Sequence, residues 1–273
     1  MFVLDACTAI NIVHIDADEF IQKKIERLGY HICKLVSTEI QNHAFDKFKL
    51  VGKLPEDEVK RINIALTYYR NRIYYVEDYL VLEPEITAMT GYTKTNGEFH
   101  SVILSFYLYR LDAELITFVT DDSPAKEFFN PFFFDQRIGQ VDDLVDLLHF
   151  LHANNDDFTL TDLKKYLSNL FYEVGSLLKG IENDINKFQI PKMLIKNKTF
   201  RQAVEDIRRA IRTLDLQKLY SIYYHILDHK KEFLPLYELM IRYKNFFNQN
   251  ISIAYFEKIK NGSALHTQAT TIV

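Results

Sequence analysis

Short apolar runs that stop at an aspartate restrict the fold of this chain more than any other feature. The run Phe2-Val3-Leu4 stops at Asp5, and the run from Leu115 to Thr120 stops at Asp121. A third run, Ile32 to Val36, lies between them, and segments with helical periodicity separate all three. Short apolar strands that alternate with helices predict βαβ units and a parallel sheet covered by helices. The first half of the chain is therefore expected to be an α/β domain.

The periodicity also predicts where the helices of this domain lie. Residues 8–28 are expected to be helical with an interruption around Asp16 and Asp18, and Ser37 or Thr38 is expected to cap a helix that carries Glu39. Residues 74–95 leave short strands and irregular structure open. The other expected elements are helices from Pro55 to about Arg72, from Glu98 to Tyr109, from Ser123 onward and from Asp142 to His152, and a fourth strand at Ile138–Val141.

The second half of the chain has a different character. Asn154 to Asp157 is expected to be a linker, and helical patterns follow it almost without a break. The chain has only 8 Gly and 6 Pro in 273 residues, which favours helix. The expected helices are Leu160–Leu178, Phe200–Leu214, Leu216–His229 and Phe233–Phe247. We therefore expect an α/β domain over residues 1–153, a helical domain over 154–260 and a flexible tail over 261–273.

Composition limits the class of protein. Hydrophobic residues make up 48% of the chain and charged residues 26%, and the formal net charge is −4, as in a globular protein with a substantial core. This charge excludes a surface that is basic throughout, but it leaves room for a local basic patch beside an acidic site. Cys7 and Cys33 are too few for a disulfide framework and are expected to be reduced. Because the sequence shows no signal peptide and no bilayer-spanning run, we expect a cytoplasmic protein without membrane contact.

Carboxylates gather at the predicted carboxyl edge of the sheet. Asp5 and the pair Asp121-Asp122 follow strands directly. Glu39 is expected in the first turn of one helix, and Glu98 opens another. In a parallel sheet these positions share the edge where α/β proteins bind ligands. Since such a cluster is costly unless cations neutralise it, and oxygen ligands suit Mg²⁺ or Mn²⁺, we expect a divalent-metal site of the type that activates water for phosphodiester cleavage.

Four segments, in order along the chain, resemble the motifs of PIN-domain nucleases. They are Leu4 to Ile12, Val36 to Ile40 with its Glu, Gly97 to Val102 with its acidic residue at the start of an apolar helix, and Phe118 to Ala125 with its Thr-x-Asp after a strand. Their order and approximate spacing agree with the family over roughly the first half of the chain, although no single motif is specific. The resemblance implies a PIN-like three-layer domain with a short parallel sheet, followed here by an all-α C-terminal region.

The resemblance also implies which residues hold metal. Asp5, Glu39 and Glu98 would be ligands, and at the fourth motif Asp122 fits Thr-x-Asp best, while Asp121 could serve instead or as well. The enzyme implied is a Mg²⁺- or Mn²⁺-dependent nuclease that cleaves RNA, with single-stranded DNA as the other substrate left open. Many bacterial relatives are toxins or defence nucleases, so an inhibitory protein partner is implied as well.

Two further positions in these motifs bear on the site. Thr120 would orient ligands or water from behind them. Cys7 departs from the family pattern, because many members have Ser, Thr or Asn at that position, and this departure puts a polar role there in doubt.

Side chains outside the motifs have more ordinary interpretations. The insertion between Glu39 and Glu98 carries aromatic and basic residues that are candidates to line a nucleic-acid groove by stacking and phosphate contacts: Tyr68, Tyr69, Tyr74, Tyr75, Arg70 and Arg72. The histidines nearest the motifs, and the pair one helical turn apart in the second half, are interpreted as solvated or packed residues: His43, His100, His225 and His229. The basic residues of the second half are interpreted as a solvated face, and its tyrosines as packing.

Three functions stay open at this point. The first is the metal-dependent nuclease. The second is a catalytically silent PIN scaffold that binds nucleic acid or protein through its helical half. The third is a helical adaptor with an unrelated α/β head. Self-association is open for all three.

Overall fold

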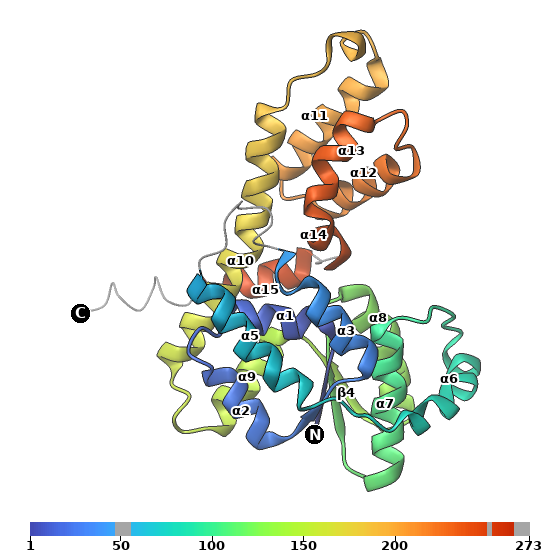
Figure 1. The fold of residues 1–273 in the computed structure, drawn as a ribbon, viewed down its shortest axis with the longest axis vertical. Coiled ribbons are helices and arrows are strands. Elements are labelled where there is room, and N and C mark those ends of the chain that lie inside the picture. Colours follow the sequence, from blue (N-terminus) through green and yellow to red (C-terminus); the bar gives the residue numbers. More distant parts are fainter. Residues whose placement is uncertain (47–55, 250–252, 265–273) are drawn as a thin grey trace. The chain divides into compact units, whose positions relative to one another are not determined.

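The computed structural model describes residues 1–46, 56–249 and 253–264 (Figure 1). The chain divides into two compact units, Met1–Leu167 and Ser168–Val273. This division falls inside one continuous helix, α10 (Leu160–Lys187), and not at the expected boundary between residues 153 and 154. The expected linker is a short turn between α9 (Leu144–Asn154) and α10.

Unit 1, residues 1–167, is built on a four-stranded parallel sheet with the order β2-β1-β3-β4. The strands are β1 (Phe2–Leu4), β2 (Tyr30–His31), β3 (Ile116–Val119) and β4 (Gly139–Asp142). Val3 pairs with His31 of β2 on one side and with Phe118 of β3 on the other. The sequence analysis is confirmed in its coarser form, since the chain combines a short parallel sheet and its helices with a helical region.

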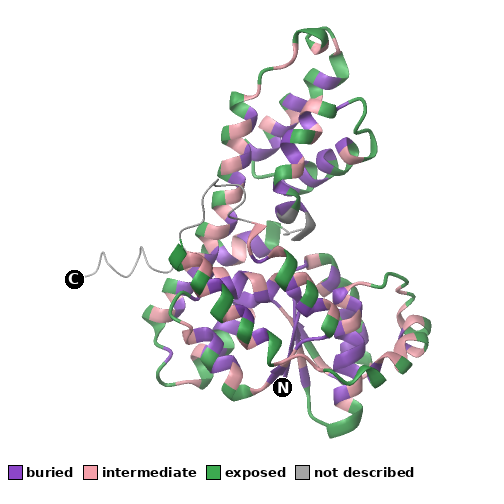
Figure 2. Ribbon diagram, viewed as in Figure 1, coloured by how far each residue is buried: buried purple, intermediate pink, exposed green. Residues whose placement is uncertain are grey.

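Helices cover both faces of this sheet. On one face, the ring of Phe2 contacts Phe150 of α9, with 5.5 Å between ring centroids. Phe118 lies one residue beyond the partner of Phe2, so its side chain points to the opposite face, where it contacts Phe133 of α8 (Ser123–Asp135) at 6.2 Å. The strands are drawn mostly as buried in Figure 2, whereas the helices around them present exposed outer faces. Unit 1 therefore has three layers.

The second expected strand needed correction. The strand is β2 at residues 30–31, and Ile32 forms an isolated bridge to Ile73. Helix α3 (Lys34–His43) begins earlier than expected because Cys33, and not Ser37 or Thr38, is its N-cap, with the Val36 N–H pointing at Cys33 Sγ at 3.5 Å. Glu39 consequently lies in the second turn of α3 and not in the first.

The remaining helices of unit 1 agree with the periodicity in most places. They are α1 (Ala6–Ile15), α2 (Phe20–Leu28), α5 (Glu56–Arg70), η1 (Glu77–Leu82), α6 (Glu83–Thr90) and α7 (Gly97–Asp112). Most of the segment 74–95, for which strands were considered, is therefore helical. Pro55, expected to open a helix, lies outside the described residues.

Unit 2, residues 168–273, is helical where it is described. After the end of α10 it contains η2 (Lys192–Leu194), α11 (Lys198–Arg212), α12 (Leu216–Asp228), α13 (Leu234–Met240), η3 (Ile241–Tyr243), α14 (Lys244–Gln249) and α15 (Ile253–Ala264). The expected helix over 233–247 is broken by the 3₁₀ turn η3. Helix α15 includes residues 261–264, which were assigned to a flexible tail, and residues 265–273 lie outside the described part.

Aromatic side chains form much of the core of unit 2. Phe200 of α11 stacks on Phe233 at 6.0 Å, and Tyr223 of α12 stacks on Phe247 of α14 at 3.9 Å between ring centroids. Burial of such large rings is the main favourable term available to a small helical unit. The expectation that Tyr223 is a packing residue is confirmed by its burial.

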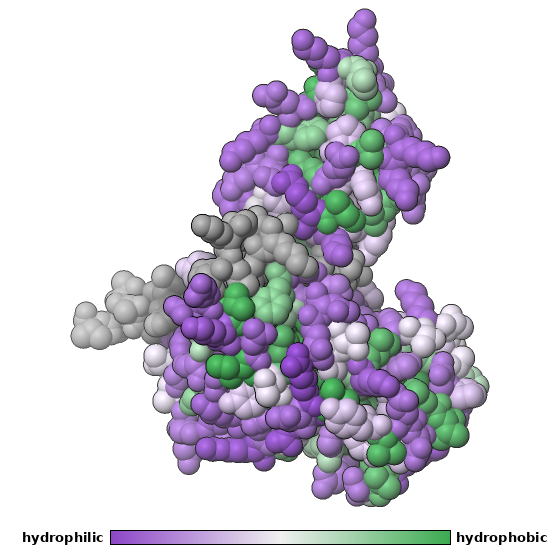
Figure 3. Space-filling model, in the orientation of Figure 1, coloured by the Kyte–Doolittle hydropathy of each residue, from purple (hydrophilic) through white to green (hydrophobic). Residues whose placement is uncertain are grey.

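Apolar side chains on the surface are scattered. In the view of Figure 3 the surface is mostly hydrophilic, with small separated apolar groups. Across the ranges that the structure describes, no helix combines the length and the apolar character needed to cross a bilayer.

Candidate active site

Asp5 stands at the carboxyl end of β1 and is the N-cap of α1. Its Oδ1 accepts a hydrogen bond from the Ala6 N–H at 2.7 Å. Its Oδ2 accepts from the Thr120 hydroxyl at 3.0 Å and from the Cys7 thiol at 3.0 Å. Three donors from two elements therefore hold this buried carboxylate in one orientation.

Thr120 and Cys7 tie the ends of β1 and β3 together. The Thr120 hydroxyl donates to Asp5 and accepts from the Asp122 N–H at 3.2 Å. The Cys7 sulfur accepts from the Asp121 N–H at 3.3 Å. Burial raises the pKa of the Cys7 thiol, and nearby carboxylates raise it further, so Cys7 keeps its proton and can donate it to Asp5. Cys7 thus has the polar role that its departure from the family pattern had put in doubt.

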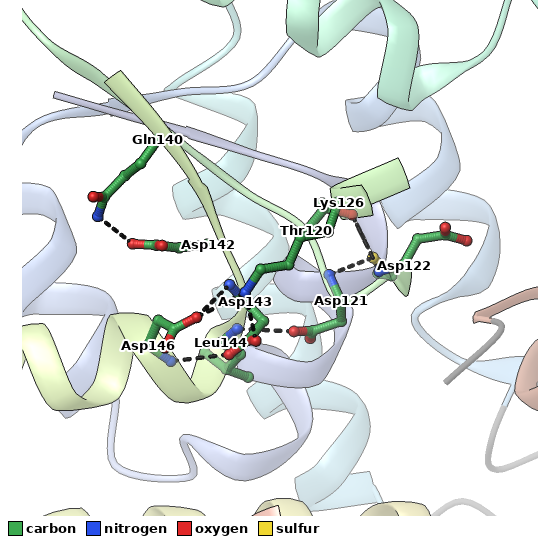
Figure 4. Close-up of polar contacts among 10 residues, drawn as sticks. Thr120, Asp121, Asp122, Lys126, Gln140, Asp142, Asp143, Leu144 and Asp146 are labelled. Carbon is green, nitrogen blue, oxygen red and sulfur yellow. Dashed lines mark hydrogen bonds and ion pairs between the residues drawn. The ribbon is translucent and has the colours of Figure 1, made fainter. Parts of the chain in front are cut away.

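The neighbours Asp121 and Asp122 have different environments. Asp121 is buried, and its carboxylate accepts from Asn11 Nδ2 at 2.7 Å and from the Leu144 N–H at the start of α9 at 2.8 Å. Asp122 is the N-cap of α8, where its Oδ1 accepts from the Ala125 N–H at 2.8 Å. Figure 4 shows the two carboxylates turned away from each other. Both oxygens of Asp121 accept hydrogen bonds that join α1 to α9, so we place Asp122 first among the ligand candidates of this pair, and the choice between the two stays a prediction.

Glu39 and Glu98 reach the site from α3 and α7. The Gly97 N–H donates to the Glu39 carboxylate, and a Cβ added at Gly97 would overlap Glu39 Oε2. Glu98 Oε2 accepts from Asn96 Nδ2 at 3.0 Å and from the Tyr92 hydroxyl at 3.4 Å. The absence of a side chain at Gly97 is thus what lets α3 and α7 bring their carboxylates to one place.

The charges of the four carboxylates interact. Burial is the largest cause of a raised pKa at each of them: it brings Asp5 to about 6, Glu98 to about 7 and Asp122 to about 7, and it raises Glu39 as well. Repulsion between carboxylates adds to the effect of burial. The charge of Glu39 raises the pKa of Asp5, and the charges of Asp5 and Glu39 raise that of Glu98. The charge of Glu98 in turn raises the pKa of Asp122. Four separate segments therefore deliver mutually repelling carboxyl groups to one edge of the sheet.

The donor set fits a hard divalent cation. Carboxylate oxygens are the ligands that Mg²⁺ and Mn²⁺ prefer, and a cation would remove the repulsion that raises these pKa values. In the described ranges, no three His, Cys, Asp or Glu side chains stand close enough together to hold an ion as they are. The carboxylates that are linked by electrostatic repulsion, and that are therefore the candidates to hold a cation, are Asp5, Glu39, Glu98 and Asp122.

Comparison with known proteins adds no assignment to this geometry. No protein-family model, curated protein or solved structure matches the chain.

The expected groove of aromatic and basic residues does not assemble. The Tyr69 hydroxyl is buried and donates to the Ala9 carbonyl, the Tyr68 hydroxyl donates to Glu19, and Arg72 pairs with Glu26 while lying over the Tyr30 ring. These side chains mainly join elements of unit 1. Tyr75 and Arg70 are the exceptions, since 71% of the Tyr75 surface is exposed and Arg70 is exposed as well.

The histidines near the site have structural partners or are packed. His43 Nδ1 is 2.8 Å from Asp46 Oδ2. Half-burial lowers the pKa of His100, which favours its neutral form. In unit 2 the ring of His229 lies 4.5 Å from that of His225, and its Nδ1 bonds the His225 carbonyl. These contacts favour the interpretation of all four as packed or solvated residues.

Two features near the site were missed from the sequence. Lys126 of α8 lies 2.8 Å from both Asp143 and Asp146, so the acidic start of α9 is neutralised within the protein. The loop 91–96 places Tyr92 and Lys94 beside Glu98 and Asp122. The sequence did offer a signal for these neighbours, because residues 91–96 directly precede Gly97 and Glu98 at the start of α7.

Proposed function

We propose that unit 1 is a divalent-metal-dependent phosphodiesterase that cleaves RNA. One observation carries the proposal: Asp5, Glu39, Glu98 and Asp122 come from four separate segments and meet at the carboxyl edge of a parallel sheet. Burial raises the pKa of each, and repulsion from a neighbouring carboxylate adds to it at Asp5, Glu98 and Asp122. An uncompensated cluster of this kind opposes folding, so its presence favours a function that needs it. The ordered set of PIN-like motifs supports the choice of phosphodiester chemistry and of RNA.

The chain's own residues position this chemistry. When bound, Mg²⁺ or Mn²⁺ would supply Lewis-acid activation of water and stabilisation of the leaving oxygen. Asp5 is oriented by Thr120 and Cys7, so its free lone pairs have a fixed direction. Asp122 is fixed by its capping contact at the start of α8. Thr120 and Cys7 act through these carboxylates and are positioning residues.

The test is cleavage of single-stranded RNA by the full chain with Mg²⁺ or Mn²⁺, and with EDTA. Asp5→Asn and Asp122→Asn are each expected to lower the cleavage rate by about a thousandfold or more, as the loss of a metal-binding or charge-stabilising group does. Asp142→Asn is the matched control, because Asp142 ends β4 and has a raised pKa but is bonded to Gln140, and the carboxylates that raise its pKa are Asp146 and Asp143 of the α9 start. Cleavage that persists in EDTA and in both site variants would overturn the proposal.

A second candidate, a binding scaffold that acts through its helical unit, is favoured by a hollow of about 390 Å³ between α11 and α12. Lys198 and Lys218 line its rim, while Ile222 and Phe233 form an apolar floor. A Mn²⁺ titration separates the candidates. A nuclease is expected to gain thermal stability with Mn²⁺ and to lose that gain in Asp5→Asn, whereas a scaffold shows no such gain.

A toxin or defence role belongs to the same proposal. Expression of the chain in a bacterial host is expected to arrest growth, and Asp5→Asn is expected to relieve the arrest. An equal arrest by both chains would exclude cleavage as its cause.

A further inference from the structure

Two aromatic rings form a ledge next to the acidic site. Tyr92 lies in the loop before α7, and Phe128 lies on α8, with 5.2 Å between their ring centroids. Tyr92 is backed by the buried rings of Phe99 at 5.1 Å and Phe129 at 4.9 Å. Phe128 leaves 44% of its surface exposed. The aromatic ledge, Tyr92 and Phe128, is therefore held from behind and open in front.

Hydrogen bonds join the aromatic ledge to the site. Asn96 Nδ2 donates to the Tyr92 hydroxyl at 3.0 Å and to Glu98 Oε2 at 3.0 Å, and the Tyr92 hydroxyl lies 3.4 Å from the same Glu98 oxygen. Asn96 is itself fixed as the N-cap of α7, where its Oδ1 accepts from the Phe99 N–H at 3.1 Å. The Tyr92 end of the ledge is therefore within hydrogen-bonding distance of Glu98, a candidate metal ligand.

A cation in the same loop completes the surface. Lys94 is exposed, and its charge lowers the pKa of Asp122, against the larger effects of burial and Glu98. Within the described ranges, its ammonium makes no ion pair at contact distance. A positive charge and an open aromatic surface beside an acidic site are complementary to a phosphate and to a nucleobase.

Exposed phenylalanines are common on protein surfaces, so exposure alone decides nothing. Phe134, on the same helix α8, is 79% exposed. The ledge differs in its fixed backing and in its hydrogen-bonded link to Glu98. A duplex buries the faces of its bases in its own stack, whereas an unpaired base offers a free face.

We propose that the aromatic ledge of Tyr92 and Phe128 binds an unpaired nucleobase next to the scissile phosphate, and that Lys94 contacts a neighbouring phosphate, so that the substrate is a single-stranded polynucleotide. This inference rests on the proposed function, because it assigns a further part of the substrate to the same site. It adds a stacking subsite and excludes duplexes as preferred ligands.

Binding without catalysis is the direct test. A short, unstructured, fluorescein-labelled RNA strand is titrated with the full chain in EDTA, beside a duplex of the same sequence. Phe128→Ala is expected to weaken binding of the single strand about tenfold, the usual effect of losing one stacked base. Phe134→Ala removes the same side chain from the same helix away from the ledge and is expected to bind as the wild type does.

A second set of variants separates stacking from packing. Phe128→Tyr keeps the ring and is expected to keep wild-type affinity, whereas Phe128→Leu keeps an apolar side chain and is expected to bind as weakly as Phe128→Ala. A 2-aminopurine base at the stacked position should lose fluorescence on binding to the wild type and not to Phe128→Leu. Lys94→Gln is expected to lower the slope of log affinity against log salt by about 0.7, as loss of one phosphate contact to a single strand does.

The outcomes distinguish this inference from the proposed function. If Asp5→Asn abolishes cleavage but Phe128→Leu binds and quenches as the wild type does, the nuclease stands and the ledge is overturned. If the wild type cleaves nothing with any divalent metal, yet Phe128→Leu loses stacking and affinity, the catalytic proposal fails and the ledge stands as a binding site. Equal affinity for the duplex, or equal loss in Phe134→Ala, also overturns the ledge.

Discussion

The two units differ in what they bury. Among the described residues, the polar or charged side chains that are buried all lie in unit 1: Asp5, Thr8, Asn11, Asp16, Gln22, Lys24, Ser37, Ser101, Ser105, Thr120, Asp121, Asp122 and Asp143. The buried side chains recorded for unit 2 are apolar or aromatic, as in the stack of Tyr223 on Phe247. Burying a polar group costs free energy unless hydrogen bonds replace water, so unit 1 carries a cost that unit 2 avoids.

All of these buried carboxylates accept hydrogen bonds that support the fold, but they differ in the charges around them. Asp121 and Asn11 satisfy each other and join α1 to α9. At Asp5, Glu98 and Asp122, by contrast, repulsion from a neighbouring carboxylate adds to burial in raising the pKa, and the nearby cation Lys94, beside Asp122, lowers that pKa by less than Glu98 raises it. The comparison teaches that unit 1 keeps an acidic edge at a cost in stability, whereas the core of the helical unit is built mainly by packing of apolar and aromatic side chains.

The largest effect expected from this difference is on the pH dependence of stability without metal. The folded pKa values of about 6 for Asp5 and about 7 for Glu98 and Asp122 lie above the ordinary values of 3.8 for Asp and 4.5 for Glu. Their contribution to stability is therefore fully present below pH ~4 and is lost as the pH rises through 6 to 7. The melting temperature in EDTA is expected to fall between pH 5 and pH 8, and added Mn²⁺ is expected to restore it most at pH 8.

Other groups titrate in the same range, so variants are needed to isolate the carboxyls. Burial lowers the pKa values of His31 and His100, which opposes the trend at low pH. Asp122→Asn removes one of the raised carboxyls and is expected to flatten the decline between pH 6 and pH 8. An unchanged decline in Asp122→Asn would show that the repulsion at the acidic edge is not its source.

The second effect separates the two neighbouring aspartates. Asp121→Ala leaves the Asn11 amide and the Leu144 N–H buried without their acceptor, so it is expected to lower the free energy of unfolding by about 2–4 kcal/mol. Asp122→Ala loses a helix cap worth about 1 kcal/mol, but it also removes the repulsion between Asp122 and Glu98. Urea unfolding at neutral pH in EDTA measures both. Equal losses in the two variants would contradict the division of roles.

The sequence was sufficient to predict which edge of the sheet carries the carboxylates, but not the detailed contacts that each carboxylate makes there. Aspartates after apolar runs were sufficient to place Asp5 and Asp122, because a strand's carboxyl end is fixed by where the apolar run stops. The choice between Asp121 and Asp122 could not be made, since it depends on Asn11 and on the start of α9, far away in the chain. The N-cap of α3 was also beyond prediction, because a cysteine is a rare cap and Ser37 is a common one.

The prediction of where helices continue or break in the second half was limited for similar reasons. Apolar periodicity located α11 and α12 to within a few residues. It could not show that α10 continues to Lys187, or that the helix expected over 233–247 breaks at η3, since both depend on which neighbouring helix the apolar face meets. The aromatic ledge was invisible for the same reason, because Tyr92 and Phe128 belong to separate segments.

Gly97→Ala is expected to have the smallest effect on stability, and its effect on the site is confined to the position of Glu39. The new Cβ would overlap Glu39 Oε2, which is the far end of a flexible side chain and can move aside. The fold is therefore expected to keep its melting temperature to within a few degrees, since alanine in a first helical turn is no worse than glycine. Glu39 would leave its position beside Glu98 and its bond to the Gly97 N–H, so RNA cleavage with Mn²⁺ is expected to fall about tenfold or more.

Gly175→Ala in α10 is the matched control from the helical unit. A Cβ at Gly175 meets nothing within 4 Å, so this change is expected to leave cleavage unaltered and to stabilise the helix by about 0.5–1 kcal/mol. The pair tests whether the same substitution has a functional cost only where α3 and α7 bring carboxylates together. Full activity in Gly97→Ala would show that the position of Glu39 does not matter to cleavage, and the candidate ligand set would shrink to Asp5, Glu98 and Asp122.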